Sequence, residues 1–129
     1  MAGEMNVARS IDEASGLVSF TVKGTVTYEG IVRALSDMMD DPRFRKAASN
    51  LWDFREASSG ALSGNEIERF AVFVDRSRER RGEGYKVAFV VSGDAEFGLA
   101  RMYEGHAERL PFKIMVFRDL DAASRWIRD

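Results

Sequence analysis

Strand-like and helix-like hydrophobic patterns alternate along most of this 129-residue chain, and the alternation restricts the fold more than any single motif. Strand patterns cover residues 6–12, 17–23, 48–54, 85–92 and 112–117, and helical periodicity covers residues 28–39, 64–80, 94–110 and 120–128. Strands that alternate with helices form mainly parallel sheets with right-handed crossovers. The order β-β-α-β-α-β-α-β-α therefore predicts one α/β domain over residues 1–129, with a five-stranded mixed, mostly parallel sheet flanked by four helices.

Residues 85–92 form the most apolar of these segments. The uninterrupted run Val87-Ala88-Phe89-Val90-Val91 is typical of a central strand that is buried on both faces. In the segment 17–23, apolar and polar residues alternate, so that strand is expected to bury one face only. Residues 13–16 have the length and composition of a hairpin turn, which makes the sheet mixed.

Helix boundaries carry capping signals. Thr27 can cap the first helix, and Ser63 with Glu66 forms a capping box before the second helix. Gly82 is expected to end that second helix. The segment 56–64, rich in serine and glycine, is predicted to be a loop.

The composition argues against several classes of function. With no cysteine and one histidine, the chain has no disulfide framework, no thiolate nucleophile and too few ligands for a structural zinc site. A formal net charge of −2 argues against a nucleic-acid partner. The apolar runs are too short to span a membrane, the start resembles no secretory signal, and the sequence motifs of nucleotide-binding loops and serine hydrolases are absent. We expect a cytoplasmic protein without a cofactor or metal.

Polar side chains follow three of the predicted strands. In open α/β sheets, ligands bind beyond the carboxyl ends of the strands, where these residues would form a rim. The candidate ligand or partner rim consists of Asp53, Arg55, Ser58, Ser59, Ser92, Asp94 and Arg118. The alternative interpretation is that Ser92 and Asp94 only cap a helix, while the two arginines are solvated.

Asp53 interrupts an apolar strand, so its carboxylate needs a partner in the fold. Pairing with Arg55 or Arg118 would give it a structural role. A hydrolase-type enzyme would instead use Asp53 with His106, and requires the two side chains within hydrogen-bond reach of a shared cleft. His106 lies on the apolar face of its helix, where a lone histidine is usually packed and hydrogen-bonded.

The helix predicted over residues 64–80 carries more apolar residues than one buried face needs. The residues that lie outside this face on a helical wheel, and that form a possible interface, are Arg69, Val72, Phe73, Arg76 and Arg80. Apolar residues ringed by arginines resemble a protein interface more than a nucleic-acid groove. We therefore expect a homodimer or a regulatory protein partner. The alternative is that the basic run 76–81 is a solvated last turn.

Four segments carry a family resemblance. They are Asp40-Asp41-Pro42-Arg43-Phe44, Leu51-Trp52-Asp53-Phe54-Arg55, Phe97-Gly98-Leu99-Ala100-Arg101-Met102-Tyr103, and Val116-Phe117-Arg118-Asp119 leading to Trp126-Ile127. Together they resemble small bacterial proteins of the STAS-like group over nearly the whole chain. This group shares the fold of the sporulation anti-sigma-factor antagonists and is often grouped with lipid-binding CRAL-TRIO domains. Most of its members have no established function, so the resemblance implies a fold first.

The resemblance also implies a possible phosphosite. In the antagonists, an Asp-Ser-Ser-Gly turn at the start of a helix carries a phosphorylated serine. The stretch Ala57-Ser58-Ser59-Gly60 is similar, although Ala57 replaces the aspartate and the helix is expected to start later, at Ser63. A phosphate on Ser58 or Ser59 would add about two negative charges to a docking surface and so make or break a contact.

Three functions remain open at this point. We favour a non-enzymatic regulatory module of STAS-like type that acts through protein interaction. The first alternative is a small-ligand or lipid-binding domain, which requires an apolar cavity between the first helix and the sheet, lined or filled by Met38, Met39 and Phe44. The second alternative is the hydrolase-type enzyme.

Overall fold

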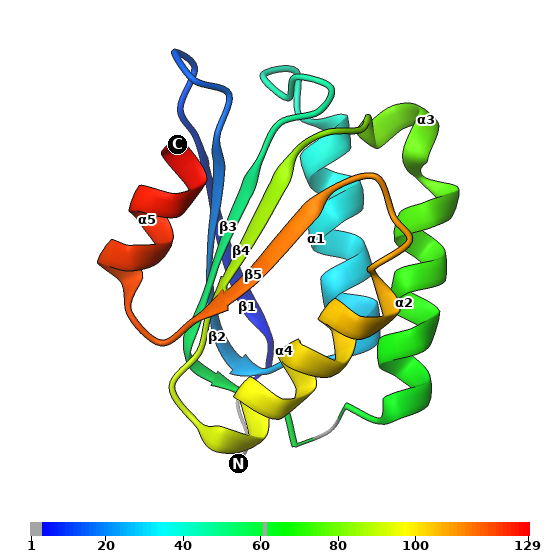
Figure 1. Ribbon diagram of the computed structural model, residues 1–129, viewed down its shortest axis with the longest axis vertical. Helices are drawn as coiled ribbons and strands as arrows, with labels where there is room; N and C mark the ends of the chain where they lie inside the picture. Colours follow the sequence, from blue (N-terminus) through cyan, green and yellow to red (C-terminus); the bar gives the residue numbers. More distant parts are fainter. Residues whose placement is uncertain (1–3, 61) are drawn as a thin grey trace.

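The computed structural model describes residues 4–60 and 62–129, and five strands in this part of the chain form one sheet (Figure 1). The strands are β1 (Asn6–Ile11), β2 (Val18–Thr25), β3 (Asn50–Ser58), β4 (Lys86–Val90) and β5 (Lys113–Phe117). They lie side by side in chain order, with β1 antiparallel to β2 and all other neighbours parallel. The predicted mixed, mostly parallel α/β sheet is confirmed. Residues 1–3, which belong to the start that resembles no secretory signal, and Ala61 of the predicted 56–64 loop lie outside the described residues.

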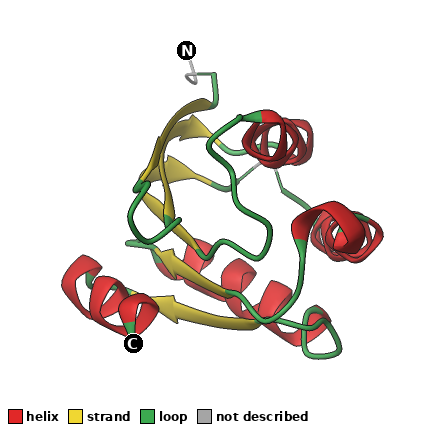
Figure 2. Cartoon of the chain, turned by 90° about the horizontal axis from the view of Figure 1, so that it is seen from above, coloured by secondary structure: helices red, strands yellow, loops and turns green. Residues whose placement is uncertain are grey.

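The helices in the described part of the chain are α1 (Tyr28–Asp40), α2 (Gly64–Arg76), α3 (Arg78–Arg81), α4 (Asp94–His106) and α5 (Leu120–Arg128). When a sheet is built in one direction, right-handed crossovers place all connecting helices on the same face. Accordingly α1, α2 and α4 lie together on one face, while α5 packs on β3, β4 and β5 from the other (Figures 1 and 2). We call these the crossover face and the α5 face.

The helix predicted over residues 64–80 is divided in two. Ser77 separates α2 from α3, and its hydroxyl donates a hydrogen bond of 2.9 Å to the carbonyl oxygen of Phe73. Such bonds to the preceding turn compete with the regular helical ladder, and α3 turns away from the axis of α2 (Figure 1). Gly82 ends α3 with a φ of +93°, and a Cβ there would lie 2.6 Å from the backbone nitrogen of Ala47, so no other residue fits.

The third strand is longer than its hydrophobic pattern predicts. Beyond the expected end at Phe54, the stretch Glu56-Ala57-Ser58 pairs with Lys23-Gly24-Thr25 of β2. These residues lack the apolar alternation of a strand, and a register shift separates them from the preceding pairs. Part of the predicted 56–64 loop is therefore ordered strand. In contrast, α4 ends at His106, four residues earlier than expected.

Two predicted helix starts, at Thr27 and Ser63, are confirmed by the hydrogen bonds of their caps, whereas α4 begins after Gly93 without a side-chain cap, so neither Ser92 nor Asp94 caps it. The Thr27 hydroxyl accepts from the backbone N–H of Gly30 at 3.0 Å, which begins α1. The Ser63 hydroxyl accepts from the N–H of Glu66, and the Glu66 carboxylate accepts from the N–H of Ser63, at 3.2 and 3.0 Å. This capping box begins α2 at Gly64 and leaves the serine pair outside the helix.

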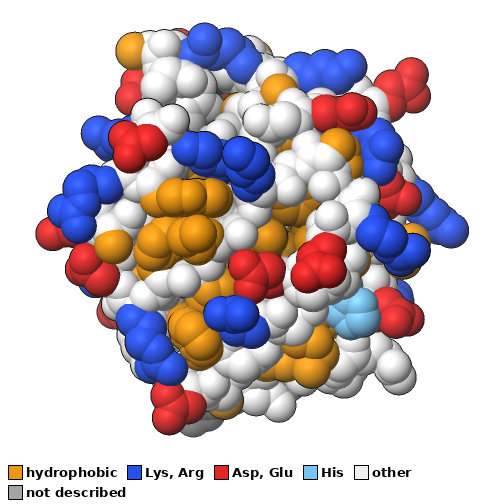
Figure 3. All heavy atoms as spheres, viewed as in Figure 1, with side chains coloured by type: hydrophobic (Ala, Val, Ile, Leu, Met, Phe, Trp, Pro, Cys, Tyr) orange, Lys and Arg blue, Asp and Glu red, His pale blue; other side chains and the backbone are white. Residues whose placement is uncertain are grey.

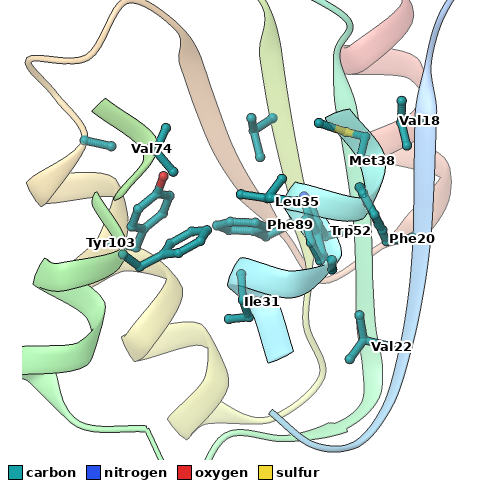
Figure 4. Close-up of a cluster of buried hydrophobic side chains, with 14 of the residues drawn as sticks. Val18, Phe20, Val22, Ile31, Leu35, Met38, Trp52, Val74, Phe89 and Tyr103 are labelled. Carbon is teal, nitrogen blue, oxygen red and sulfur yellow. The ribbon is translucent and has the colours of Figure 1, made fainter. Parts of the chain in front are cut away.

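The core on the crossover face is built from an aromatic row. The rings of Phe20 and Trp52 stack with centroids 3.9 Å apart, and Phe54, Phe89 and Tyr103 continue the row toward α4. Figure 4 labels four of these rings, Phe20, Trp52, Phe89 and Tyr103, together with three α1 side chains of the same core, Ile31, Leu35 and Met38. Large flat rings stabilise the layer through burial and stacking, and they also leave gaps where their shapes do not match.

Candidate functional site

Five of the seven predicted rim residues form one network at the carboxyl ends of the strands. The Arg55 guanidinium donates two hydrogen bonds of 2.9 Å to the carboxylate of Asp53. The Ser92 hydroxyl donates to the carbonyl oxygen of Arg55 at 3.3 Å. Arg118 donates to the carbonyl oxygen of Ser92 at 3.1 Å and to the carboxylate of Asp94 at 2.8 Å. The network joins the ends of β3, β4 and β5, and its charges are paired with one another.

The structure separates the two residues of the hydrolase hypothesis. The Arg55 guanidinium beside Asp53 holds the pKa of that carboxyl below its usual range, so Asp53 is an ionised partner of Arg55. Asp53 pairs with Val90, at the carboxyl end of β4. His106 is the last residue of α4, which runs back toward the amino end of β5. Trp52 points into the core of the crossover face, so the alternation along β3 directs the neighbouring Asp53 to the α5 face, whereas the helix that carries His106 covers the crossover face. The two side chains therefore lie on opposite faces of the sheet.

The two serines of the predicted phosphosite have different surroundings. The Ser59 hydroxyl donates to Glu96 Oε2 at 2.8 Å, the Ser59 N–H donates to the same oxygen at 3.2 Å, and the residue is 6% exposed. These two bonds from Ser59 lower the pKa of the Glu96 carboxyl. Ser58, in contrast, is exposed at the end of β3. Of the two hydroxyls, that of Ser58 is the accessible one.

Two of the five predicted interface residues, Arg69 on α2 and Arg80 on α3, pair with residues of α1. The Arg69 guanidinium lies over the ring of Tyr28, 4.3 Å from its centroid, and Arg80 forms an ion pair of 2.7 Å with Asp40. The α2 residues that contact α1 therefore include part of the expected outer stripe.

Phe73 and Val72, two further residues of the predicted interface, differ in how far they are exposed. Phe73 is half-buried and packs against the core of the crossover face, so it does not lie opposite the buried face as the wheel suggested. Its neighbour Val72 is 46% exposed, and Arg76 is exposed as well. Val72 and Arg76 are the members of the predicted interface that remain free to meet another molecule.

A cavity of about 100 Å³ lies between the crossover helices and the sheet. Its wall is almost entirely apolar, with Phe70, Val74, Phe89, Leu99 and Tyr103 among the residues that line it. Three of these, Val74, Phe89 and Tyr103, are labelled in Figure 4. An apolar cavity in this layer is the feature that the ligand-binding alternative requires.

Of the three residues expected to line or fill this cavity, Met38, Met39 and Phe44, only one lines it. Met39 lines it, whereas Met38 is completely buried in the surrounding core. Phe44 lies outside the cavity, with its ring centroid 5.9 Å from the guanidinium of Arg81.

Arg81 is the charged residue of the cavity wall that the sequence pattern does not predict. It is 3% exposed, and no acceptor within the described residues lies within hydrogen-bond distance of Nη1 or Nη2. Its guanidinium lies over the ring of Tyr85, 3.6 Å from the centroid, and burial lowers the pKa of Arg81 to about 10. The interpretation of the run 76–81 as a solvated turn is wrong for this residue. The break at Ser77 changes which side of the helical segment faces inward.

Glu96 is a second functional candidate that the sequence reasoning missed. It lines the cavity at the carboxyl end of the sheet, where it holds Ser59. Its position in the first turn of α4 gave only the ordinary signal of an acidic residue near a helix N-terminus.

Across the ranges 4–60 and 62–129, no cluster of three metal-ligating side chains is found, and no helix is long and apolar enough to cross a membrane.

Comparison with known proteins places this geometry in a recognised fold. No family model and no curated protein sequence matches the chain. A solved structure of an uncharacterised DUF3478-family protein with a SpoIIAA-like fold, from Shewanella loihica, matches with 17% identity and a TM-score of 0.61 over 98% of both chains. An anti-sigma factor antagonist from Mycobacterium paratuberculosis matches with 14% identity and a TM-score of 0.64 over the full length of both chains. The chain has a STAS-like fold. The predicted resemblance is thereby confirmed at the level of the fold.

Proposed function

We propose that this protein is a cytoplasmic, non-enzymatic regulatory module that docks a protein partner at the carboxyl end of its sheet. The observation that carries the proposal is the exposed hydroxyl of Ser58, which lies at the end of β3. It precedes Ser59, whose backbone and side chain are held by Glu96. A modifiable hydroxyl beside an anchored residue suits a surface that is switched by charge.

Two further features support a docking role. The rim formed by Asp53, Arg55, Ser92, Asp94 and Arg118 presents paired charges at this end of the sheet, and such groups set partner choice more than affinity. The Mycobacterium paratuberculosis protein of the same fold is an anti-sigma factor antagonist. A protein partner for the present chain is the proposal that fits both features.

Phosphorylation of the serine pair can be tested by peptide mapping. The purified protein is incubated with ATP and a lysate of its native host, and the peptide containing both serines is analysed by fragmentation mass spectrometry. We expect phosphate on Ser58 and not on Ser59, because the Ser59 hydroxyl is buried against Glu96. Phosphate on Ser59 alone, or on neither serine, would contradict the proposed switch.

Docking can be tested with charge variants and a matched control. Ser58→Asp places a carboxylate on the proposed surface, whereas Ser10→Asp places the same group on β1, where Ser10 is also exposed. Chemical cross-linking in host lysate should identify one partner that binds the unmodified protein and the Ser10 variant equally well. The affinity of the Ser58→Asp variant for this partner should be about tenfold lower or higher. Equal behaviour of the two variants would exclude this end of the sheet as the docking surface.

We also propose that the chain forms a homodimer through the outer side of α2, with Val72 and Arg76 in the contact. Both side chains are exposed, whereas Arg69 and Arg80 are already paired with α1. Sedimentation equilibrium should detect a dimer that Val72→Asp weakens and that Thr21→Asp, on the exposed part of β2, leaves unchanged. A monomer at the highest attainable protein concentration would contradict the proposal.

A further inference from the structure

The cavity on the crossover face contains a charged group that lacks a partner. Arg81 lines the cavity and is almost fully buried, and within the described residues its Nη1 and Nη2 atoms have no hydrogen-bond acceptor. A buried cation without a partner is destabilising unless another group compensates its charge. The stacking of Arg81 on the ring of Tyr85 compensates part of this effect, but it uses the face of the guanidinium and none of its N–H groups.

The backbone around Arg81 holds the side chain in this position. Its N–H donates to the carbonyl oxygen of Ser77 at 2.8 Å, and its carbonyl oxygen accepts from the N–H of Ala47 at 2.8 Å. Gly82 permits the close approach to Ala47, since any side chain there would collide with it. A residue fixed on both sides is pre-organised, so a ligand would not have to order it on binding.

The free N–H groups of a guanidinium are a specific receptor for an oxyanion. Their planar fork matches the two oxygens of a carboxylate, and charge-assisted bonds of this kind are about twice as strong as neutral ones. The charged residues that line the cavity in the described part of the chain are Arg81 and Glu96. One cation suits a monoanion better than a doubly charged phosphate, because a second negative charge would remain unpaired.

The position of Glu96 fixes the orientation of such a ligand. Arg81 precedes β4 and Glu96 follows it, so the two charges lie near opposite ends of that strand. The Glu96 carboxylate repels an anion at its end, and its bonds to Ser59 keep it ionised. The anionic head of a ligand therefore belongs at the Arg81 end of the cavity.

The volume and the wall of the cavity determine the remainder of the ligand. Its volume is about 100 Å³, and the wall between the two charges consists mainly of aromatic and aliphatic side chains. An apolar cavity of about 150 Å³ in another protein accommodates benzene. A body of about one ring, or of a few methylene groups, is the size that fits without opening the helices.

We propose that this cavity binds a small apolar carboxylic acid, an aryl or short-chain carboxylate, with its carboxylate on Arg81 and its body among Phe70, Phe89 and Leu99. Glu96 borders both this site and the docking surface proposed above, but neither proposal requires the other. Hydrophobic side chains also gather near α5 and β5 in Figure 3, but among the described residues neither element has a buried polar side-chain atom without a partner.

The test uses benzoate and hexanoate as probes, with benzyl alcohol and hexanol as uncharged controls of similar size. Binding to the full chain is followed by two-dimensional amide NMR, which reports both affinity and location. We expect benzoate or hexanoate to bind about tenfold more tightly than its alcohol, with shifts at the amides of Val74, Tyr85 and Leu99. Arg81→Met should abolish this preference. Arg78→Met, which changes an exposed arginine of the same short helix, should keep it.

A second variant keeps the proposal testable if Arg81→Met fails to fold. Ala100 lines the cavity, and Ala100→Leu would fill part of it without touching Arg81. We expect this variant to weaken binding of the acids by about tenfold while its near-ultraviolet circular dichroism stays native. Three results would each overturn the proposal: no saturable shifts up to about 10 mM of either acid, equal affinity for acid and alcohol, or equal loss in the Arg81 and Arg78 variants.

Discussion

The two faces of the sheet bury their apolar residues in different ways. On the crossover face, α1, α2 and α4 cover a row of large rings, and this layer still contains a cavity of about 100 Å³ and a buried guanidinium. On the α5 face, one helix covers a small cluster of mostly aliphatic side chains: Leu17, Leu51, Ala88, Val90, Ala123 and Ile127. The larger core is thus the one with the larger packing defect.

This difference indicates a division of roles between the faces. Protein interiors are normally close-packed, and both a cavity and an unpaired charge destabilise them. A core that retains both has kept features that binding can use and that folding does not need. On the α5 face, in contrast, the ammonium group of Lys86 has a partner, because it donates to the carbonyl oxygen of Trp126 at 2.9 Å.

The largest expected effect comes from the aromatic row. Trp52→Ala should lower the free energy of unfolding by about 3–5 kcal/mol, because Trp52 is almost fully buried between Phe20 and Phe54. Urea denaturation followed by far-ultraviolet circular dichroism measures this quantity. A loss below about 1 kcal/mol would mean that the row is not the main support of this core.

The α5 face should respond more weakly. Ile127→Ala removes a buried side chain of α5, and we expect a loss of about 2 kcal/mol, at the low end for this substitution, since α5 is short and the core that it covers is small. Arg128→Ala, an exposed neighbour, should change the stability by less than about 0.5 kcal/mol. If Ile127→Ala were as damaging as Trp52→Ala, the contrast between the faces would not hold.

Removal of the unpaired charge should stabilise the protein. Arg81→Met replaces a buried guanidinium by an apolar chain of similar length, and we expect an increase in stability of about 1–2 kcal/mol after the loss of the contact with Tyr85. The control Arg78→Met should have little effect, because Arg78 is exposed. A marked destabilisation by Arg81→Met would show that Arg81 supports the fold. The crossover face would then no longer differ from the α5 face by carrying a charge that folding does not need.

The smallest effect is expected at the rim and depends on pH. Hydrogen bonds from Arg55 lower the pKa of Asp53 in the folded protein, so the ionised carboxylate stabilises the fold. This contribution is complete above the unfolded-state pKa of about 3.9 and is lost as the pH falls below it. Asp53→Asn should therefore lower stability at pH 6 by less than about 1 kcal/mol and have almost no effect at pH 2. Thermal unfolding at both pH values measures the difference, and an equal effect at both would exclude the ion pair as its cause.

Local signals predicted much of the architecture. The caps at Thr27 and Ser63 and the order of strands and helices are all confirmed. These features depend on residues close together in the chain, where hydrogen-bond chemistry and hydrophobic periodicity act directly. The rim could also be anticipated, since the carboxyl ends of neighbouring parallel strands meet at one end of a sheet.

Other features have no such local signal. The tail of β3 is polar and becomes a strand only because β2 lies beside it. Ser59 meets Glu96 across 37 positions of sequence. A helical wheel predicts Phe73 outside the buried face, because the wheel cannot show where the neighbouring helices lie.

By itself, the sequence determined the class of fold, the starts of α1 and α2 and the side chains available at the end of the sheet. Only the tertiary structure decided that Arg81 is the buried residue of the run 76–81. The helix breaks at Ser77, whose hydroxyl binds the backbone of the preceding turn, and Gly82 lets the end of α3 approach Ala47. The tertiary structure also decided that the crossover helices leave a cavity, since the space between large rings depends on how distant elements pack and not on what each segment encodes. The candidate ligand site is therefore a property of the assembled layers.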